Sequence, residues 1–555
     1  TSACFILGLK DSLLEDGGIL DTLKEEARIF KFGSGSGINY STLRAHGTPL
    51  SNGGVSSGLM SFLNTFDANA GSIKSGGTTR RAARMVVVDC DHPEAETFVT
   101  WKAKEEIKVA AMAAARANTK PSADDEFTAN VLSSLGADYE GEAYRTVGGQ
   151  NANNSLRVTN EFMKSVSVDS GATGLPTDPY TSKVRRLWEK TIDAAWRCGD
   201  PGIQFHDTCN EWHTIPKVAP QRATNPCSEY SFIDDSACNL ASLNLTAFLG
   251  EDGRLDSTAF EHAVRLWTIT LDITVGMSSY PNARIAENAM KWRTLGLGYA
   301  NLGGLLMLLG LPYDSAGGRR VAATITSAMQ AVAWRTSAEL AADPELGPFH
   351  DYRHHAEDVL RVLEKHRTAH AKVLVGDKLD TDPAFGLHEL ATSEWESLSA
   401  EKPPIRSAQL TLLAPTGTIS FVLDAATTGV EPDFSLVKYK KLAGGGSMTL
   451  VNPLVEESLR RAGYSSQQIV EIAEYVKSQG RVDKLCPHIK VEHIPVFDCA
   501  NDIDWKGHIA MMVAVQPFLS GAISKSVNMP NNATRADIGE AYILAWKGGL
   551  KALAV

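Results

Sequence analysis

Segments of strand length alternate with segments of helical periodicity along the whole of this 555-residue chain. An apolar run at residues 4–9 predicts a buried strand, and apolar residues at helical spacing follow between 19 and 30. The alternation continues with a strand at 86–88, an amphipathic helix at 254–277 and a strand that ends at Leu413. Length alone would allow two or three domains. Because no internal repeat or linker interrupts the alternation, we predict one large α/β barrel.

Composition and charge narrow the class of protein. Hydrophobic residues make up 43% of the chain and charged residues 21%, which is typical of a soluble globular enzyme. The net charge of −11 argues against binding to nucleic acid or to an anionic membrane. The longest apolar run, 305–311, is too short to cross a bilayer, and no signal peptide is visible. Eight cysteines are too few for a disulfide scaffold, so we expect a reducing cytoplasm.

The string Asn225-Pro226-Cys227-Ser228-Glu229 carries the strongest chemical signal. Pro226 lacks an N–H and biases the residue before it away from helix, so we expect Cys227 at the tip of a loop. If Cys227 and Glu229 are extended, both side chains point to the same side. A thiol, an amide and a carboxylate would then meet, and they could serve hydrogen-atom transfer, hydrogen bonding to a hydroxyl and general base catalysis. A buried structural thiol beside a surface glutamate is the alternative.

A second signal is the turn at 413–420, where Pro, Thr and Gly follow a strand. Hydroxyls and N–H groups at the expected start of a helix are the usual parts of a phosphate cradle, although an ordinary capped turn has the same composition. Glycines also alternate at 33–37, where backbone can approach a ligand closely. A basic loop at 75–85 contains three arginines, which suit phosphate recognition or a solvated loop equally.

Two further motifs resemble ligand-binding sites but lack the residues or the spacing that such sites need. His206, Cys209 and His213 resemble half of a zinc site, but no second Cys/His pair completes it. The small residues at 295–303 lack the spacing of a dinucleotide fingerprint, and we interpret them as permitting tight helix packing.

Over nearly its whole length the chain resembles the large, catalytic subunit of ribonucleotide reductases. The matching segments include 225–229, 413–420, 429–432 and 516–530, and the sequence of the first segment is most similar to that of the class II enzymes. The resemblance implies a ten-stranded α/β barrel of the ribonucleotide reductase and glycyl-radical type. It also implies a single catalytic domain over residues 1–555, with a central finger loop at about 222–238.

The resemblance implies a role for each residue of the cluster. Cys227 would be oxidised to a thiyl radical, Glu229 would take the 3′-hydroxyl proton, and Asn225 would hydrogen-bond the reacting hydroxyls. Cys4 and Cys238 would be the dithiol that closes to a disulfide and supplies two electrons. That disulfide requires their Cα atoms to approach to about 5.5 Å, although they lie 234 positions apart (238 minus 4).

The resemblance also implies ligand contacts and partners. The ribonucleotide substrate would be bound by Ser2, Ala3, Gly35, Pro415, Thr416, Gly417, Thr418, Ile419 and Ser420. A deoxynucleotide or ATP effector would be bound by Asp11, Ser12, Arg44, Arg80 and Arg81. A thioredoxin-type or dithiol reductant would restore the redox pair, the chain could form a homodimer, and no protein-held metal is expected.

The radical initiator separates the subclasses. Class I enzymes relay an electron through two adjacent tyrosines near the end of the barrel, where this chain has Leu553, Ala554 and Val555. Without that relay, adenosylcobalamin acting inside the pocket is the initiator that fits. A class I subunit with a divergent relay and a non-catalytic nucleotide-binding regulatory protein are the alternatives. The chain begins without Met inside its first expected strand, so we expect a fragment. Compared with the family it resembles, we expect it to lack the N-terminal helical region and the C-terminal cysteine tail.

Overall fold

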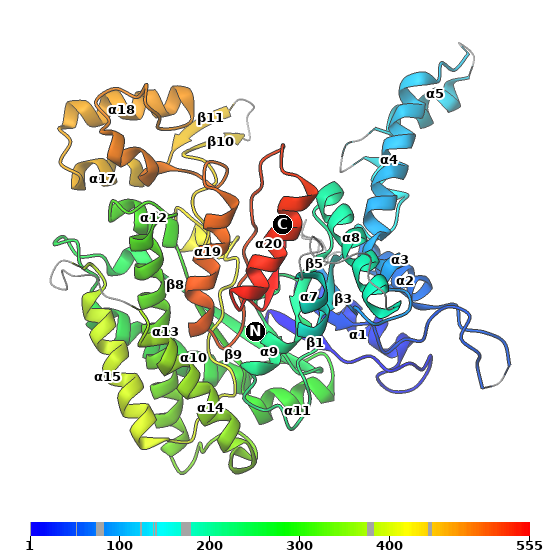
Figure 1. Cartoon of the computed structure of the whole chain (residues 1–555), viewed down its shortest axis with the longest axis horizontal. Helices are drawn as coiled ribbons and strands as arrows, with labels where there is room; N and C mark the ends of the chain where they lie inside the picture. The colour runs from blue at the N-terminus through cyan, green and yellow to red at the C-terminus, as the bar shows by residue number, and fades with distance from the viewer. Residues whose placement is uncertain are drawn as a thin grey trace.

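An eight-stranded curled sheet runs through the middle of the molecule (Figure 1). The computed structural model describes residues 2–51, 53–73, 83–122, 125–136, 138, 141–167, 179–373, 382–441 and 447–555. The strands follow the order β12-β5-β4-β3-β2-β1-β8-β9. Their bounds are β1 Cys4–Leu7, β2 Gly35–Asn39, β3 Ala83–Asp89, β4 Asn153–Val158, β5 Gly202–Phe205, β8 Ser236–Asn244, β9 Leu295–Ala300 and β12 Ala552–Leu553.

Two short segments close this sheet into a barrel. Residue Thr411 bridges Leu297 of β9 in parallel, and Leu413 bridges Ile523. A further parallel bridge joins Ser526 to Ala554 beside β12. Segments 411–413 and 523–526 therefore add two strands to the eight, which confirms the predicted ten-stranded barrel.

The barrel consists of two parallel halves that run in opposite directions. Strands β1 to β5 pair in parallel, and so do β8, β9 and the segments that follow them. The two seams, β1 with β8 and β5 with β12, are antiparallel. Because one seam lies between β1 and β8, the start of the chain faces a strand more than 200 positions away.

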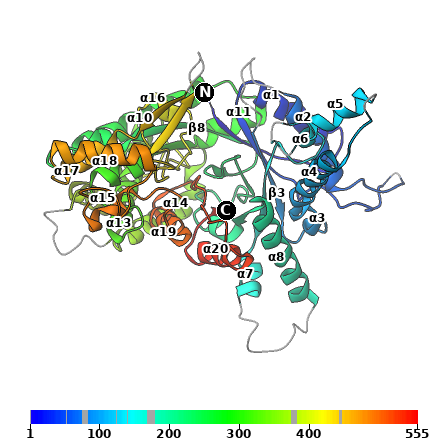
Figure 2. The ribbon, with the colours of Figure 1, turned by 90° about the horizontal axis from the view of Figure 1, so that it is seen from above.

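Helices surround the strands on the outside (Figure 2). One group, with α1 to α4 and α8, lies on the side of β1 to β5, and α10, α13, α14 and α15 lie on the other side. The longest helix, α13, has mostly small side chains on all faces, and most of its residues are buried because helices pack around it. The α-helices are α1 Ile19–Lys31, α2 Leu59–Ser72, α3 Ala95–Val99, α4 Trp101–Asn118, α5 Glu126–Ser134, α6 Glu142–Arg145, α7 Asn160–Ser167, α8 Pro179–Cys198, α9 His206–Glu211, α10 Ser257–Met277, α11 Ala283–Trp292, α12 Leu302–Leu308, α13 Ala316–Ala342, α14 Tyr352–His370, α15 Phe385–Glu401, α16 Ile419–Val422, α17 Leu454–Arg461, α18 Ser466–Gln479, α19 Trp505–Val515 and α20 Arg535–Lys547; the 3-10 helices include η1 Leu245–Phe248, η3 Val491–Phe497 and η4 Gln516–Phe518.

The glycines at 295–303 lie mostly in a strand, so the interpretation as helix packing is wrong for most of that segment. Gly296 and Gly298 belong to β9. A Cβ on Gly296 would lie 2.8 Å from the sulfur of Cys238, and one on Gly298 would lie 2.4 Å from the carbonyl oxygen of Leu412. The missing side chains let neighbouring barrel strands approach.

A small lobe carries a second hydrophobic core. It contains the hairpin of β10 Val437–Lys441 and β11 Ser447–Val451 together with α17 and α18. Figure 1 shows it beyond α12, and Met307 of α12 belongs to its core. The prediction of one catalytic domain over 1–555 stays a prediction.

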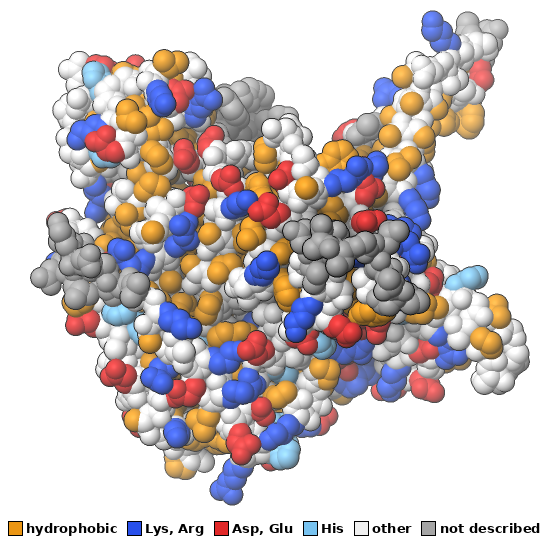
Figure 3. Space-filling model, viewed as in Figure 1, with side chains coloured by type: hydrophobic (Ala, Val, Ile, Leu, Met, Phe, Trp, Pro, Cys, Tyr) orange, Lys and Arg blue, Asp and Glu red, His pale blue; other side chains and the backbone are white. Residues whose placement is uncertain are grey.

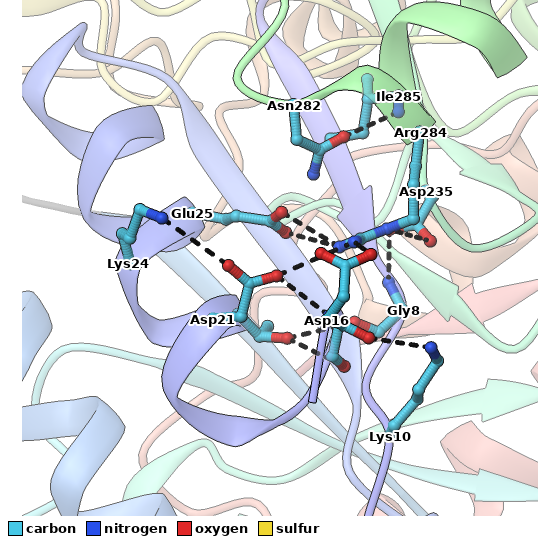
Figure 4. Close-up of polar contacts among 12 residues, drawn as sticks. Gly8, Lys10, Asp16, Asp21, Lys24, Glu25, Asp235, Asn282, Arg284 and Ile285 are labelled. Atoms are coloured by element: carbon cyan, nitrogen blue, oxygen red, sulfur yellow. Dashed lines mark hydrogen bonds and ion pairs between the residues drawn. The ribbon is translucent and has the colours of Figure 1, made fainter. Parts of the chain in front are cut away.

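One arginine joins the start of α1 to the start of β8 (Figure 4). The guanidinium of Arg284 lies 3.0 Å from carboxylate oxygens of Asp16 and Glu25 and 3.3 Å from Asp235. Because Asp235 directly precedes β8, this cluster fixes the loop before α1 against the strand that contains Cys238.

The outer surface offers no large patch of one charge on the face drawn in Figure 3, where acidic and basic side chains are interspersed. Among the described residues, no helix combines the length and the apolar character needed to cross a membrane.

Candidate active site

A hairpin enters the barrel from between β5 and β8 in the sequence. Its arms are β6 Ala223–Thr224 and β7 Ser231–Phe232, which pair antiparallel. At the tip, the N–H of Ser228 donates to the carbonyl of Asn225 over 3.1 Å. Ser228 has a φ of 69°, so the tip is a tight turn rather than an extended strand. The hairpin lies within the predicted finger loop.

Strand β2 holds one side of this hairpin. A Cβ on Gly37 would lie 1.6 Å from the carbonyl oxygen of Thr224, and one on Gly35 would lie 2.6 Å from the ring of Pro226. The alternating glycines therefore make room for the finger, where the sequence predicted the approach of a ligand. On the other side, the N–H of Ala522 donates to the carbonyl of Glu229 over 2.7 Å.

The two cysteines predicted as a redox pair face each other across the β1–β8 seam. Cys4 is the direct partner of Cys238 in the antiparallel register. Direct partners in such a pair have Cα atoms about 4.5–5.5 Å apart, which is within the range for a disulfide. Both thiols are buried, and burial raises the pKa of each well above its ordinary value.

Glu229 and Asn225 lie against the Cys4 end of this pair. The Sγ of Cys4 is 3.7 Å from Oε1 of Glu229, and Nδ2 of Asn225 donates to that sulfur over 3.1 Å. Oδ1 of Asn225 accepts from the N–H of Tyr230 over 3.0 Å, which fixes the orientation of the amide. Burial raises the pKa of Glu229 to about 7. Its Oε2 is buried without a protein partner, so it can accept a hydrogen bond from a bound hydroxyl.

Cys227 differs from these buried residues in its exposure. It is exposed and lines a cavity of about 290 Å³. Because Ser228 between Cys227 and the buried Glu229 has a positive φ, the segment is not extended, and the condition under which both side chains would point to the same side is not met. Cys227 lies at the tip of the finger between the redox pair and this cavity, whose walls include Asn153, Asn154 and Ser155 of β4, Gly202 of β5, Pro415, residues 523–526 and Ala552, Leu553 and Ala554.

Comparison with known proteins identifies the family. The family model described as "Ribonucleotide reductase, barrel domain" matches residues 2–555. The chain belongs to this family. A protein of Streptomyces coelicolor named vitamin B12-dependent ribonucleotide reductase is 45% identical over 569 residues, covering 100% of this chain and 56% of that protein. One of Agrobacterium fabrum with the same name is 40% identical over 718 residues, with the same two coverages. The chain therefore spans 56% of the length of these relatives.

A solved structure supports the fold alone. The alpha subunit of the class Id ribonucleotide reductase of Actinobacillus ureae superposes with a TM-score of 0.66 at 19% identity, covering 100% of this chain and 83% of that one.

In this ribonucleotide reductase barrel, the turn predicted to bind substrate phosphate is built around Thr416. Its hydroxyl accepts from the N–H of Gly429 over 2.7 Å and lies 3.1 Å from the hydroxyl of Ser420. Thr416 has a φ of 52°, which directs the chain into the single turn of α16. Gly417, Thr418 and Ile419 are exposed, and no atom lies within 4 Å of where a Cβ on Gly417 would be.

The other predicted substrate contacts lie on both sides of the finger. Pro415 lines the cavity beside Cys227, and Gly35 is buried under Pro226. Ser2 and Ala3 precede Cys4 and are at least partly exposed.

The predicted effector residues are brought together in part. Nε of Arg44 donates to the carboxylate of Asp11 over 2.5 Å, and Ser12 follows in the same loop. Arg80 and Arg81 lie outside the described residues. The third arginine of that basic loop, Arg84, is 1% exposed and donates to Glu26 over 3.0 Å, so it is not available for a phosphate.

The residues whose spacing resembles half of a zinc site belong to the wall around the base of the finger. His213 is buried, and its ring contacts the carbonyl of Ala219 at 3.0 Å and the amide of Gln221 at 3.1 Å. His206 contacts Arg157 instead. Across the part of the chain that the structure describes, no group of three or more His, Cys, Asp or Glu side chains is arranged to hold a metal ion.

Sequence reasoning missed the contribution of β4. Asn153, Ser155 and Arg157 alternate along this strand, and the first and third reach the finger at Pro226 and Gln221. A polar residue at every second position of a barrel strand is the signal that could have identified this lumen-facing row.

Proposed function

We propose that the chain is the catalytic barrel of a class II ribonucleotide reductase, which converts ribonucleotides into 2′-deoxyribonucleotides. The pairing of Cys4 with Cys238, with Cys4 in contact with Asn225 and Glu229 on either side of the finger tip that contains Cys227, carries this proposal. The names of the B12-dependent relatives support the choice of class.

Each residue has a part in the reaction. The Cys227 thiyl takes the hydrogen atom from C3′ while Glu229 takes the 3′-hydroxyl proton, and the 2′-hydroxyl leaves as water with a proton from the dithiol. Cys4 and Cys238 close to a disulfide and supply two electrons, and their second thiol hydrogen is added to C2′, where the hydroxyl has left. Cys227 then returns its hydrogen atom to C3′ and Glu229 its proton. Ribonucleotide and dithiol thus become deoxyribonucleotide, disulfide and water.

The cavity beside Cys227 fits an initiator with a nucleoside-sized group. Its volume of about 290 Å³ lies just below the usual range for small-molecule sites, about 300–1,000 Å³. Ala552, Leu553 and Ala554 form part of its wall, where bulky aromatic side chains would take up space. Adenosylcobalamin, when bound, supplies a radical by homolysis of its cobalt–carbon bond.

Substrate, effector and reductant complete the proposal. The turn at Thr416 and the N–H groups after it would hold the substrate phosphates. The loop with Asp11 and Ser12, together with Arg44, would bind a deoxynucleotide or ATP effector. A thioredoxin-type protein or a small dithiol would reduce the Cys4–Cys238 disulfide, and two copies could assemble as a homodimer.

Turnover with adenosylcobalamin and a dithiol, in the absence of any metal-containing subunit, tests the proposal. Deoxynucleotide formation that disappears in Cys227→Ser supports it. A class I enzyme would form no product under these conditions, and a regulatory protein would bind nucleotide without product. Unchanged turnover by Cys227→Ser would remove the radical assignment.

A further inference from the structure

Asn153 is the first residue of β4, and it contacts the finger at the peptide bond before Cys227. Its Nδ2 donates to the carbonyl oxygen of Pro226 over 2.8 Å. Because a carbonyl can only accept, this contact fixes which end of the amide faces the finger. The peptide plane that receives the bond leads directly to the Cα of Cys227.

Two other barrel elements hold the same hairpin, but neither acts on that peptide through a side chain. Gly35 of β2 leaves space for the ring of Pro226, and Ala522 binds the carbonyl of Glu229 beyond the tip. Further along β4, Arg157 donates to the carbonyl of Gln221 at the base of the finger. The lumen-facing side chains of β4 thus contact the hairpin at both ends, and Asn153 acts at the end with the thiol.

The surroundings of Asn153 argue against a mainly structural role. Its side chain is exposed and borders the cavity that Cys227 lines. A hydrogen bond between neutral groups that water can reach contributes little to global stability. The same bond restrains one peptide whose position sets the direction of the Cys227 sulfur.

We propose that Asn153 is a positioning residue, which holds the tip of the finger so that the Cys227 sulfur keeps a fixed direction between the redox pair and the cavity. The radical role of Cys227 rests on the proposed function, but the restraint on the tip does not. Misplacement of a reacting group by about 1 Å can lower a rate by about 10².

The mobility of the finger tip can be measured without turnover, through the reactivity of the Cys227 thiol. Cys227 is the one exposed cysteine of the eight, all of which the structure describes. Asn153→Asp keeps the shape of the side chain and removes the N–H donor, and Asn153→Ala removes both. We expect alkylation of Cys227 by iodoacetamide, and amide hydrogen exchange of the peptide that contains it, to become about fivefold faster in both variants, the factor that corresponds to one hydrogen bond of average net strength. The melting temperature should stay near that of the wild type.

Asn130→Asp, the same change on an exposed residue of α5, is the matched control and should leave both rates unchanged. Turnover should show kcat lower by about tenfold to hundredfold in Asn153→Asp with KM unchanged, since the substrate contacts remain. Alkylation and exchange at wild-type rates in both variants would overturn the proposal. If Cys227→Ser is inactive while the Asn153 variants keep wild-type rates of alkylation and exchange, the proposed function stands and only the role of Asn153 is removed.

Discussion

The proposed role of Glu229 as a general base places two opposing demands on its side chain. A general base has to lose its proton near neutral pH, and burial between the finger and β1 makes the ionised form unfavourable. The pKa of about 7 is the result of that burial, with hydrogen bonds from Asn225 and Cys4 acting in the opposite direction. A base with a pKa near the working pH is the arrangement that proton transfer favours.

Replacement of Glu229 by Gln should therefore stabilise the fold at high pH while it abolishes turnover. The folded state holds the Glu229 proton more tightly than the unfolded chain, so the stability of the wild type falls as pH rises from about 4.5 through about 7. Glu229→Gln removes this loss, which is on the order of 3 kcal/mol above pH 7. Urea unfolding at pH 5 and pH 8 measures it. A difference between variant and wild type that is the same at both pH values would contradict the buried carboxylate.

The redox pair should oxidise slowly at neutral pH. Since burial raises the pKa of Cys4 and Cys238 well above the ordinary thiol value, few thiolates are present at pH 7, and thiolate is the form that reacts. We expect diamide to close a Cys4–Cys238 disulfide at a rate that rises steadily from pH 7 to pH 9. Peptide mapping under non-reducing conditions identifies the bond, and Cys238→Ser serves as the control. A fast reaction that is independent of pH would show that the pair is accessible as thiolate.

At the scale of elements, strand β2 and the finger fit together only because β2 has no side chain at Gly37. A Cβ there would lie 1.6 Å from the Thr224 carbonyl oxygen, so Gly37→Ala should displace the hairpin and cost about 2–3 kcal/mol. Gly276→Ala is the opposite case, because nothing lies within 4 Å of a Cβ at that position in α10. It should stabilise the protein by about 0.5–1 kcal/mol. Thermal unfolding compares the two, and equal effects would contradict the packing of β2 on the finger.

The junction between the loop before α1 and β8 depends on Arg284. Arg284→Met leaves Glu25, which is 4% exposed, and Asp235 without their shared cation. We expect a loss of about 2 kcal/mol, below the cost of breaking a fully buried pair, because the guanidinium is 29% exposed. Arg265→Met, which breaks an exposed pair with Glu339, should cost less than about 1 kcal/mol. Urea unfolding that ranks the two variants in the reverse order would show that the cluster adds nothing.

Sequence patterns predict helices and strands more easily than they predict the contacts between them. Alternating strands and helices predict the barrel, since that alternation requires parallel strands with helices outside. Segment 411–413 corresponds to the strand predicted to end at Leu413, whereas periodicity does not reveal segment 523–526, because isolated bridges are enough to close the ring. The partnership of Cys4 with Cys238 follows from the antiparallel seam, and only the family resemblance suggested it beforehand. Arg84 lies in a basic loop by composition, whereas Glu26 and Tyr40 from distant elements bury it.

At the scale of the whole molecule, the barrel brings together residues from both of its halves. The β1–β8 seam provides Cys4 and Cys238, the proposed redox pair, and β4, β5 and β12 form the opposite wall beside Cys227. The finger crosses the space between them and contacts β2, β4 and the segment at 521–522. An initiator in the cavity and a substrate above the dithiol would therefore meet only at the tip, which lets one cysteine serve both.

The small lobe does not contribute to the candidate active site. Because it has its own hydrophobic core, we expect it to unfold independently of the barrel. One of its contacts with the barrel is made on α12, where a Cβ on Gly304 would lie 2.7 Å from Leu454. Ile472 is fully buried in the core of the lobe, so Ile472→Ala should cost the lobe about 2–5 kcal/mol. We expect native-state hydrogen exchange to become fast in α17 and α18 while β1 and β8 keep their protection, because the barrel core is a distinct cluster of residues. A loss of protection in the lobe and the barrel strands together would mean that the two cores unfold as one unit.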